Sequence, residues 1–337
     1  MATPRILVTG APGWLGNALV HALSEGGQFG PAVQEPEAVR VLASPTADIR
    51  ALSALSGVEV VRADIRQPVP PALFHGVQTV VHSAGLIHPK RVADLTAVNV
   101  DGTRHVLAAA QSAGVRRFIH ISSNSAAGLN RSPHTLMRED DPDESPYLGY
   151  GRSKAGAEAL VRQAGSAMET VILRPCWFYG PHQPLRQTTF FRMIAHGRPP
   201  VFGDGSNLRS MSYVDNIVQG VLLARASAAA PGRTYWIADE RPYAWLEILE
   251  TVARILGTRL RPRYVPALTS DACRIADTWI QRTGLYQQEL HVAGELGATI
   301  AVSVARAQAE LGFQPHIALE EGMRRSIAWC RAQGVQL

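Results

Sequence analysis

The sequence predicts an α/β fold in which a doubly wound parallel sheet carries helices on both faces and a smaller lobe follows toward the C-terminus. Short, nearly continuous apolar runs recur along the chain, helical stretches separate them, and the composition changes after residue 180. Strands that are buried on both faces of a parallel sheet have this apolar character. The 337 residues, of which 46% are hydrophobic, are enough to bury such a core.

The elements can be placed in order from the N-terminus. The run RILVTG (5–10) predicts a first strand, and the periodic stretch 13–27 predicts a helix that ends at a glycine pair. The remaining strands are predicted at 38–43, 58–64, 77–85, 116–123, 170–175 and 234–239, and the main later helices at 93–113 and 150–164. The connection 26–37 is longer than a helix-to-strand link usually needs, and the sequence assigns it no role.

Two domains are expected from the change in composition. Residues 1–180 form the sheet domain, to which a strand near 234–239 returns, and residues 181–337 form mainly a substrate-binding lobe. The lobe begins with a stretch rich in Gly, Pro and Arg and continues into a helical tail that carries arginines.

Composition excludes several classes of function. The net charge of +5 is spread along the chain without a clustered basic patch, so we expect no nucleic-acid partner. The three cysteines lie far apart without metal-binding spacing, so neither a disulfide framework nor a metal site is expected. No apolar run reaches the length of a membrane span, and the N-terminus enters a strand at once, so we expect no membrane partner and a cytoplasmic location.

A glycine-rich turn follows the first predicted strand. In VTGAPGWLG, Gly10, Gly13 and Gly16 lie where the strand ends and the helix begins. Glycines permit a tight turn, and the N–H groups of the helix N-terminus bind the pyrophosphate of a dinucleotide. The order of strand, turn and helix therefore predicts a Rossmann-type dinucleotide site.

The choice between NAD and NADP stays open. An acid at the end of the second strand usually binds the adenosine ribose of NAD. Here Ala43 and Ser44 stand at that end, so Ser44 takes the place of the acid, and no arginine stands there to receive a 2′-phosphate. The absence of a carboxylate at this position slightly favours NADP over NAD.

Tyr150 and Lys154 lie one turn apart on the helix predicted at 150–164. A tyrosine has a pKa of about 10, which is too high for a base at neutral pH, and a nearby ammonium favours the phenolate. Tyr–Lys pairs at this spacing are common on solvated helix faces, so only the other motifs can indicate whether this pair has a catalytic role.

Taken together, the motifs resemble the extended short-chain dehydrogenase/reductase family of NAD-dependent epimerases, dehydratases and 3β-hydroxysteroid dehydrogenases, from about residue 5 to 330. The similar segments are TGAPGWLG (9–16), ADI (63–65), VVHSAG (80–85), NVDGT (99–103), ISSNSAAG (121–128), YGRSK (150–154), LRPCWFYGP (173–181) and YVDN (213–216). The resemblance implies a nicotinamide dinucleotide, NAD or NADP, and a small-molecule substrate. The residues implied to bind the cofactor are Gly10, Gly13, Trp14, Leu15, Gly16, Ser44, Asp64, Ile65, Ser83, Ala84, Gly85, Asn99, Ser122, Tyr150, Lys154 and Pro175.

The same resemblance implies a catalytic set of Ser123, Tyr150 and Lys154. Tyr150 is the expected acid/base, Lys154 lowers its pKa and holds the nicotinamide ribose, and Ser123 hydrogen-bonds the reacting oxygen, with Ser122 and Ser125 as its rivals. The cofactor supplies hydride chemistry, and the protein supplies position and the proton. A homodimer formed through the helices near 93–113 and 146–165 is also implied.

Two substrate classes remain open. Arg209, in GDGSNLRSMSYVDN (203–216), lies where sugar-nucleotide epimerases place an arginine on the diphosphate, which favours a nucleotide-sugar epimerase or a related dehydratase or reductase. Trp177 stands where many sugar-nucleotide members have an asparagine, and with Phe178 it makes that wall apolar. This apolar wall of the pocket favours the alternative function, an NAD(P)-dependent dehydrogenase or ketoreductase of a steroid-like or other apolar secondary alcohol. A redox sensor without turnover is a third hypothesis, against which the intact Tyr150 and Lys154 count.

Overall fold

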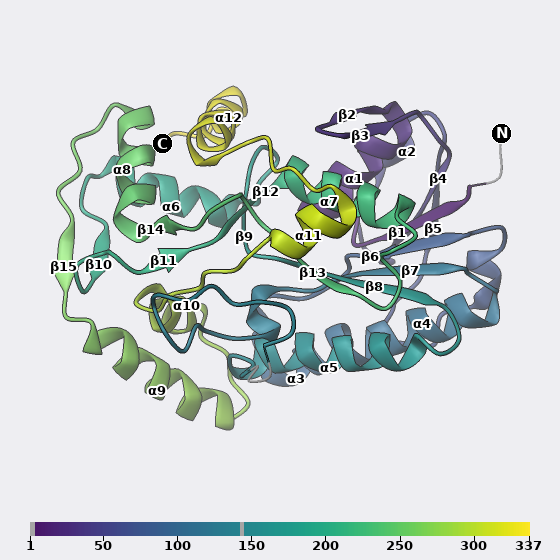
Figure 1. The fold of residues 1–337 in the computed structure, drawn as a ribbon, viewed down its shortest axis with the longest axis horizontal. Helices are drawn as coiled ribbons and strands as arrows, with labels where there is room; N and C mark the ends of the chain where they lie inside the picture. Colours follow the sequence, from purple (N-terminus) through teal and green to yellow (C-terminus); the bar gives the residue numbers. More distant parts are fainter. Residues whose placement is uncertain (1–3, 142–144) are drawn as a thin grey trace.

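A seven-stranded parallel sheet forms the centre of the molecule in a computed structural model that describes residues 4–141 and 145–337 (Figure 1). Its strands lie in the order β5-β4-β1-β6-β7-β8-β13, and every neighbouring pair is parallel. In chain order they are β1 (Ile6–Thr9), β4 (Val39–Ala43), β5 (Val58–Arg62), β6 (Thr79–His82), β7 (Arg117–Ile121), β8 (Glu169–Pro175) and β13 (Thr234–Ile237). The predicted doubly wound parallel sheet is confirmed.

Helices cover both faces of this sheet, as Figure 1 shows. One face carries α3 (Val92–Leu95), a π-helical turn η2 (Thr96–Asp101), α4 (Gly102–Ser112) and α5 (Leu148–Ala164), and the other carries α1 (Trp14–Glu25), α7 (Val214–Ala226) and α11 (Ala305–Leu311). Short helical turns α2 (Arg50–Ser53), η1 (Pro71–Phe74) and η3 (Asn124–Ala126) complete the connections. Successive residues of β1 point to opposite faces, so Ile6 and Val8 join the core on the α1 side and Leu7 joins the core on the α4 side.

A smaller lobe lies at one end of the sheet, at the left of Figure 1. Its helices are α6 (Leu185–Ala195), α8 (Trp245–Leu256), α9 (Leu268–Arg282), α10 (Gln288–Leu296) and α12 (Leu319–Ala332). Short strand pairs join them: β9 (Trp177–Tyr179) with β12 (Met211–Tyr213), β10 (Pro200–Phe202) with β15 (Arg263–Val265), and β11 (Leu208–Arg209) with β14 (Tyr243–Ala244). Strand β8 runs almost directly into β9, so the end of the sheet leads into the lobe.

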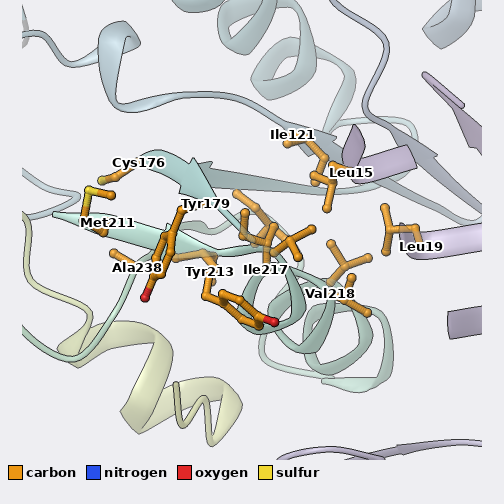
Figure 2. Close-up of a cluster of buried hydrophobic side chains, with 14 of the residues drawn as sticks. Leu15, Leu19, Ile121, Cys176, Tyr179, Met211, Tyr213, Ile217, Val218 and Ala238 are labelled. Atoms are coloured by element: carbon orange, nitrogen blue, oxygen red, sulfur yellow. The ribbon is translucent and has the colours of Figure 1, made fainter. Parts of the chain in front are cut away.

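One hydrophobic core extends from the sheet domain toward the lobe. Figure 2 shows Leu15 and Leu19 of α1 and Ile217 of α7 in the same cluster as Tyr179 and Tyr213 of the β9–β12 pair. Cys176 is also buried there, where it is a small core residue, and burial raises the pKa of its thiol.

The long connection 26–37 contains a small hairpin, β2 (Gly27–Phe29) and β3 (Ala32–Gln34). Just after the hairpin, Glu37 forms an ion pair with Arg225 of α7, with 2.8 Å between Oε2 and Nη2. The connection therefore covers part of α7, a role that the sequence did not indicate.

None of the helices in the two described ranges combines the length and the apolar character needed to cross a bilayer.

The chain reverses direction across the sheet beside β1. It proceeds outward from β1 to β4 and β5 and then returns to β6 on the other side of β1. Crevices outside the carboxyl ends of strands at such a switch point are where open α/β sheets bind ligands.

Candidate active site

The glycine turn after β1 is closed tightly against its surroundings. Gly10 has φ +86°, and a Cβ added to it would lie 2.6 Å from the backbone nitrogen of Ala84. A Cβ on Gly13 would lie 2.6 Å from the Gly10 carbonyl oxygen, and one on Gly16 would lie 2.5 Å from the Ala11 nitrogen. All three positions therefore exclude a side chain, and the turn is as compact as the sequence predicted.

The N-terminus of α1 opens directly from this turn. Gly13 is its N-cap residue, no side chain caps it, and its first turn contains no acidic residue. The first N–H groups of a helix and the positive end of its dipole attract an anion under these conditions. The turn thus has the form of a pyrophosphate cradle.

The end of β6 borders the same turn. The Ser83 hydroxyl donates to the Thr9 carbonyl at 2.6 Å, and the Ala84 N–H donates to the Thr9 hydroxyl at 3.1 Å. On the other side, the Trp14 indole N–H donates to the Pro181 carbonyl at 2.6 Å. Leu15 is buried in the core, so only its backbone is available to a ligand.

Arginines bind the loops that follow β4 and β5. Ser44 is exposed after β4, and the Arg62 guanidinium donates to the carbonyls of Ser44 at 3.0 Å and Pro45 at 2.7 Å. Asp64 forms an ion pair with Arg66 at 2.6 Å, whose hydrogen bonds lower the pKa of the Asp64 carboxyl. The sequence did not reveal this positive charge near Ser44, because Arg62 lies on β5, the strand that pairs with β4.

Asn99 and Ile65 hold the framework of the site together. The Asn99 side chain accepts from the Leu86 N–H at 2.7 Å and donates to the Leu86 carbonyl and the Ser153 hydroxyl, both at 2.9 Å. It therefore joins the loop that contains Gly85 to α5 from the π-helical turn. The Ile65 side chain packs against Gly102, where an added Cβ would meet its Cδ1 at 2.9 Å.

Helix α5 brings Lys154 and Tyr150 to the end of β7. The buried Lys154 Nζ donates to the Ile121 carbonyl at 2.7 Å, and burial lowers its pKa to about 8, although Glu158 opposes the shift. Tyr150 is half-buried one turn earlier on the helix. Gly151 allows the close approach, because a Cβ there would lie 2.3 Å from the Ser125 carbonyl oxygen.

The serines after β7 differ in what their hydroxyls contact. Ser123 is partly exposed, and its Oγ accepts from the Ser125 N–H at 3.2 Å. Ser122 is buried and donates to a Glu158 carboxylate oxygen at 2.5 Å. Ser123, which the sequence ranked first, is therefore the serine whose hydroxyl remains best able to meet a substrate.

Glu158 is the centre of a buried ion-pair cluster behind Lys154. It accepts from Arg174 Nε at 2.8 Å and Nη2 at 2.6 Å, and from Arg162 Nη2 at 2.7 Å. Burial opposes ionisation, but these arginines hold the pKa of Glu158 below its ordinary value. The sequence analysis missed this cluster, although Lys154, Glu158 and Arg162 follow one another at four-residue spacing along one face of the helix.

Aromatic side chains line the start of the lobe, just after Pro175. The Trp177 ring stacks on Trp245 with centroids 5.7 Å apart and meets Phe190 edge-on at 5.3 Å. Phe178 lies 6.0 Å from Trp14, which continues the aromatic surface toward the glycine turn. Trp245 and Phe190 lie too far from Trp177 in the sequence for any spacing to reveal them.

Arg209 is buried in the lobe. One guanidinium nitrogen donates to the Glu295 carbonyl, and the Nε has no hydrogen-bond partner within the described residues. Burial lowers the pKa of this arginine, against the opposing effect of the Glu295 carboxylate. A buried cation with an unsatisfied donor is suited to an anionic ligand.

A cleft of about 400 Å³ opens where the loop after β6 meets the lobe. The side chains that line it include His88, Lys90, Tyr286 and Glu289. The Tyr286 hydroxyl lies 3.2 Å from His88 Nδ1, and burial chiefly raises its pKa, with smaller contributions from the charges of Glu295 and Asp277. Tyr286 also packs against His291, whose ring packs against Tyr147 at the start of α5.

Comparisons with known proteins show the family to which the chain belongs. The sequence model described as the NAD dependent epimerase/dehydratase family matches residues 6–238. The protein y4nL of Sinorhizobium fredii is 42% identical, and the alignment covers 98% of this chain and 96% of that protein. The 2-alkyl-3-oxoalkanoate reductase of Stenotrophomonas maltophilia is 29% identical over 95% of this chain and 98% of its own.

Among solved structures, the dTDP-glucose 4,6-dehydratase DesIV of Streptomyces venezuelae, with NAD bound, has a TM-score of 0.74 and 26% identity. The similarity covers 97% of each chain, so it includes both the sheet domain and the lobe.

Proposed function

Because the chain belongs to the NAD dependent epimerase/dehydratase family of extended short-chain dehydrogenases/reductases, we propose that it moves a hydride at a secondary alcohol or ketone carbon, with Tyr150 carrying the proton. The observation that carries the proposal is the buried Lys154 ammonium, fixed 2.7 Å from the Ile121 carbonyl and one helical turn from Tyr150. A buried cation at this place favours the phenolate form of the tyrosine.

The residues present fit a nicotinamide dinucleotide. Gly10, Gly13 and Gly16 leave no room for side chains, and the uncapped N-terminus of α1 faces the turn. Those backbone groups would hold the pyrophosphate, and Lys154 would hold the nicotinamide ribose. When bound, the cofactor supplies the hydride chemistry, while the protein orients the reacting carbon and controls the proton.

The protein's own contribution is a proton transfer at the Tyr150 hydroxyl. Ser123 would hydrogen-bond the reacting oxygen and keep it within reach of the phenol. Lys154, partly neutralised at pH values above about 8, would stabilise the phenolate only while it carries its charge. We therefore assign Ser123, Tyr150 and Lys154 as the catalytic residues.

For the substrate we propose a nucleotide sugar, which would make the reaction an epimerisation or a related dehydration or reduction. The support is Arg209, because its unsatisfied buried Nε would gain a partner in a diphosphate. DesIV, which is similar along the whole chain, is a dTDP-glucose 4,6-dehydratase. Arg209 and Trp177 would then both contact the substrate.

A second candidate is an apolar secondary alcohol or its ketone, turned over with exchangeable NAD(P). The observation that favours it is the aromatic lining formed by Trp177, Phe178 and Phe190, with the buried Trp245 stacked behind Trp177, because apolar and aromatic linings bind apolar ligands. A 2-alkyl-3-oxoalkanoate reductase among the relatives is consistent with this class.

Arg209→Met separates the two candidates. Nucleotide sugars and long-chain 3-oxo compounds are offered to the wild-type protein with both nicotinamide cofactors, and products are identified by mass. If a nucleotide sugar is the substrate, Arg209→Met raises its KM at least about tenfold, whereas Arg198→Met, at an exposed arginine of the same lobe, leaves the KM unchanged. Turnover of the 3-oxo compound alone, unaffected by Arg209→Met, would establish the second candidate instead.

We also propose that two chains associate through α4 and α5. Ala108 and Ala159 are exposed on these helices, and small residues permit close packing of helices.

A further inference from the structure

The catalytic helix α5 begins without a cap of its own. Tyr147 is its N-cap residue and provides no side-chain hydrogen bond to the first turn. An N-cap side chain normally accepts from the N–H of the second or third helical residue, which here are Gly149 and Tyr150. Since Tyr150 lies in this turn, whatever caps it also fixes the proposed acid/base.

A glutamine of the lobe takes the place of the missing cap. The Gly149 N–H donates to Gln281 Oε1 at 2.9 Å, and Gln281 lies near the end of α9, 132 residues further along the chain. This is the hydrogen bond that an N-cap side chain would make, supplied by a different part of the molecule. The first turn of α5 is therefore attached to the lobe rather than only to the sheet.

A buried pair fixes Gln281 in turn. Its Nε2 donates to both carboxylate oxygens of Asp277, at 3.0 and 3.1 Å, and His291 Nδ1 lies 2.8 Å from the same carboxylate. Asp277 is 0% exposed and His291 is 3% exposed. Buried hydrogen bonds of this kind restrict the motion of the side chains that they join.

The same network holds the residue that precedes the helix. The His291 ring packs against Tyr147 with centroids 4.7 Å apart and against Tyr286 at 5.2 Å. Tyr147 is buried, and its hydroxyl fits against Gly294 of α10, where a Cβ would lie 2.5 Å from the oxygen. Contacts from α9 and α10 thus lie on both sides of Leu148.

Leu148 itself shows that this start of the helix is held in place. Its φ is +51°, a left-handed conformation that is rare for a bulky residue. Such a conformation persists only where the surrounding structure determines it, and such sites cluster where function needs a fixed geometry. Here its two neighbours both contact the lobe: Tyr147 packs against His291, and Gly149 donates to Gln281.

We propose that Gln281, Asp277 and His291 are positioning residues that set the first turn of α5, and with it Tyr150, from the substrate lobe. The inference rests on the proposed role of Tyr150 and adds to it a means by which the lobe controls the orientation of the phenol. None of the three residues needs to touch substrate or cofactor for this effect.

The test is Gln281→Met, which keeps the length of the side chain and removes its hydrogen bonds with Gly149 and Asp277. Amide hydrogen exchange at Gly149, Tyr150 and Gly151 should accelerate at least about tenfold, while exchange in the second half of α5 stays unchanged. With the substrate that the experiment under the proposed function identifies, kcat should fall about tenfold and the KM for the cofactor should stay within about twofold. The matched control is Gln163→Met, at an exposed glutamine near the other end of the same helix, which should change neither.

A second variant tests the connection between the three residues. Asp277→Asn should slow turnover in the same way. The double variant Asp277→Asn/Gln281→Met should be no slower than Gln281→Met alone, because Asp277 acts by holding Gln281 in its hydrogen bond with Gly149. Additive losses would show that they act separately and would overturn the proposed network.

Unchanged exchange in Gln281→Met would overturn the proposal, and so would faster exchange with unchanged kcat. The exchange measurement needs no substrate, so it separates this inference from the proposed function. If Tyr150→Phe retained full turnover, the proposed role of Tyr150 would fail, even where exchange showed that Gln281 caps the helix.

Discussion

Lys154 combines a chemical role with a cost in stability. Its ammonium is buried and donates a hydrogen bond to the Ile121 carbonyl. Burial lowers the pKa from 10.5 to about 8, which means that the folded protein disfavours the charged form that the proposed chemistry needs. Functional sites commonly contain residues whose pKa values are shifted in this way.

The pH dependence of stability should reveal this residue. Below about pH 8 both folded and unfolded chains hold the Lys154 proton, but between about 8 and 10.5 the unfolded chain holds more of it, so the contribution of Lys154 to the free energy of unfolding rises with pH. Lys154→Met removes this contribution. Its stability relative to the wild type should therefore be highest near neutral pH and should fall by up to about 3 kcal/mol toward pH 10. Urea unfolding of both proteins across this range measures the difference, and a constant difference would contradict the lowered pKa.

Glu158 should be sensitive to the loss of its charge. The carboxylate is completely buried between Arg174 and Arg162, and Arg174 is also 0% exposed. Glu158→Gln leaves the Arg174 guanidinium buried without its counter-charge, which should destabilise the protein by about 3–5 kcal/mol. Thermal unfolding measures the effect.

The double variant Glu158→Gln/Arg174→Met serves as the control for that prediction. It removes both charges, so it should recover part of the lost stability. A double variant less stable than Glu158→Gln alone would show that the ion pair does not account for the loss.

Among the elements, the glycine turn and α5 depend on close approach of backbone. Gly16 lies where α1 passes over the turn, and Gly151 lies where α5 meets the loop after β7. In both places, the space that a methyl group would need is occupied by backbone, which cannot move aside as a side chain can.

Gly16→Ala should weaken cofactor binding more than it weakens the fold. The added Cβ would lie 2.5 Å from the Ala11 nitrogen, so the turn must shift away from α1. We expect the Kd for the nicotinamide cofactor to rise at least about tenfold, measured by calorimetry. Gly156→Ala, at a helical glycine where the nearest atom is the end of a valine side chain at 3.3 Å, should leave that Kd unchanged.

At the scale of the whole molecule, the proposed dimer predicts the mass of the protein in solution. The chain has a mass of 36.4 kDa, and light scattering should give twice this value for the wild type. Ala159→Glu places a charge on the exposed face of α5 and should give monomers, whereas Ala276→Glu, on the exposed face of α9, should not. A monomeric wild type would contradict the proposed association.

At the same scale, much of the fold was predictable because buried parallel strands and a glycine turn leave local signals. The seven apolar runs, including the one at 234–239, correspond to the seven strands of the sheet. The positions of Tyr150 and Lys154 on one helix also followed from spacing alone. Ser123 was chosen from the family resemblance alone.

Other features of the site could not be predicted, because they depend on contacts between distant segments. Asn99 and Ser122 were expected to bind cofactor, and the sequence could not show that their side chains meet Leu86, Ser153 and Glu158. The hydrogen bond from Gly149 to Gln281 and the stacking of Trp177 on Trp245 have no local pattern at all.

The most direct test of the account is the turnover of Tyr150→Phe with saturating substrate and a saturating concentration of the nicotinamide cofactor that the wild type uses. We predict that kcat falls by about 10²–10⁴, the usual contribution of a general acid, while the Kd for the cofactor stays within about twofold of the wild type. This result would place the proton on Tyr150 and leave the glycine turn intact. Full turnover in Tyr150→Phe, or a wild-type protein that binds neither NADH nor NADPH, would contradict the account.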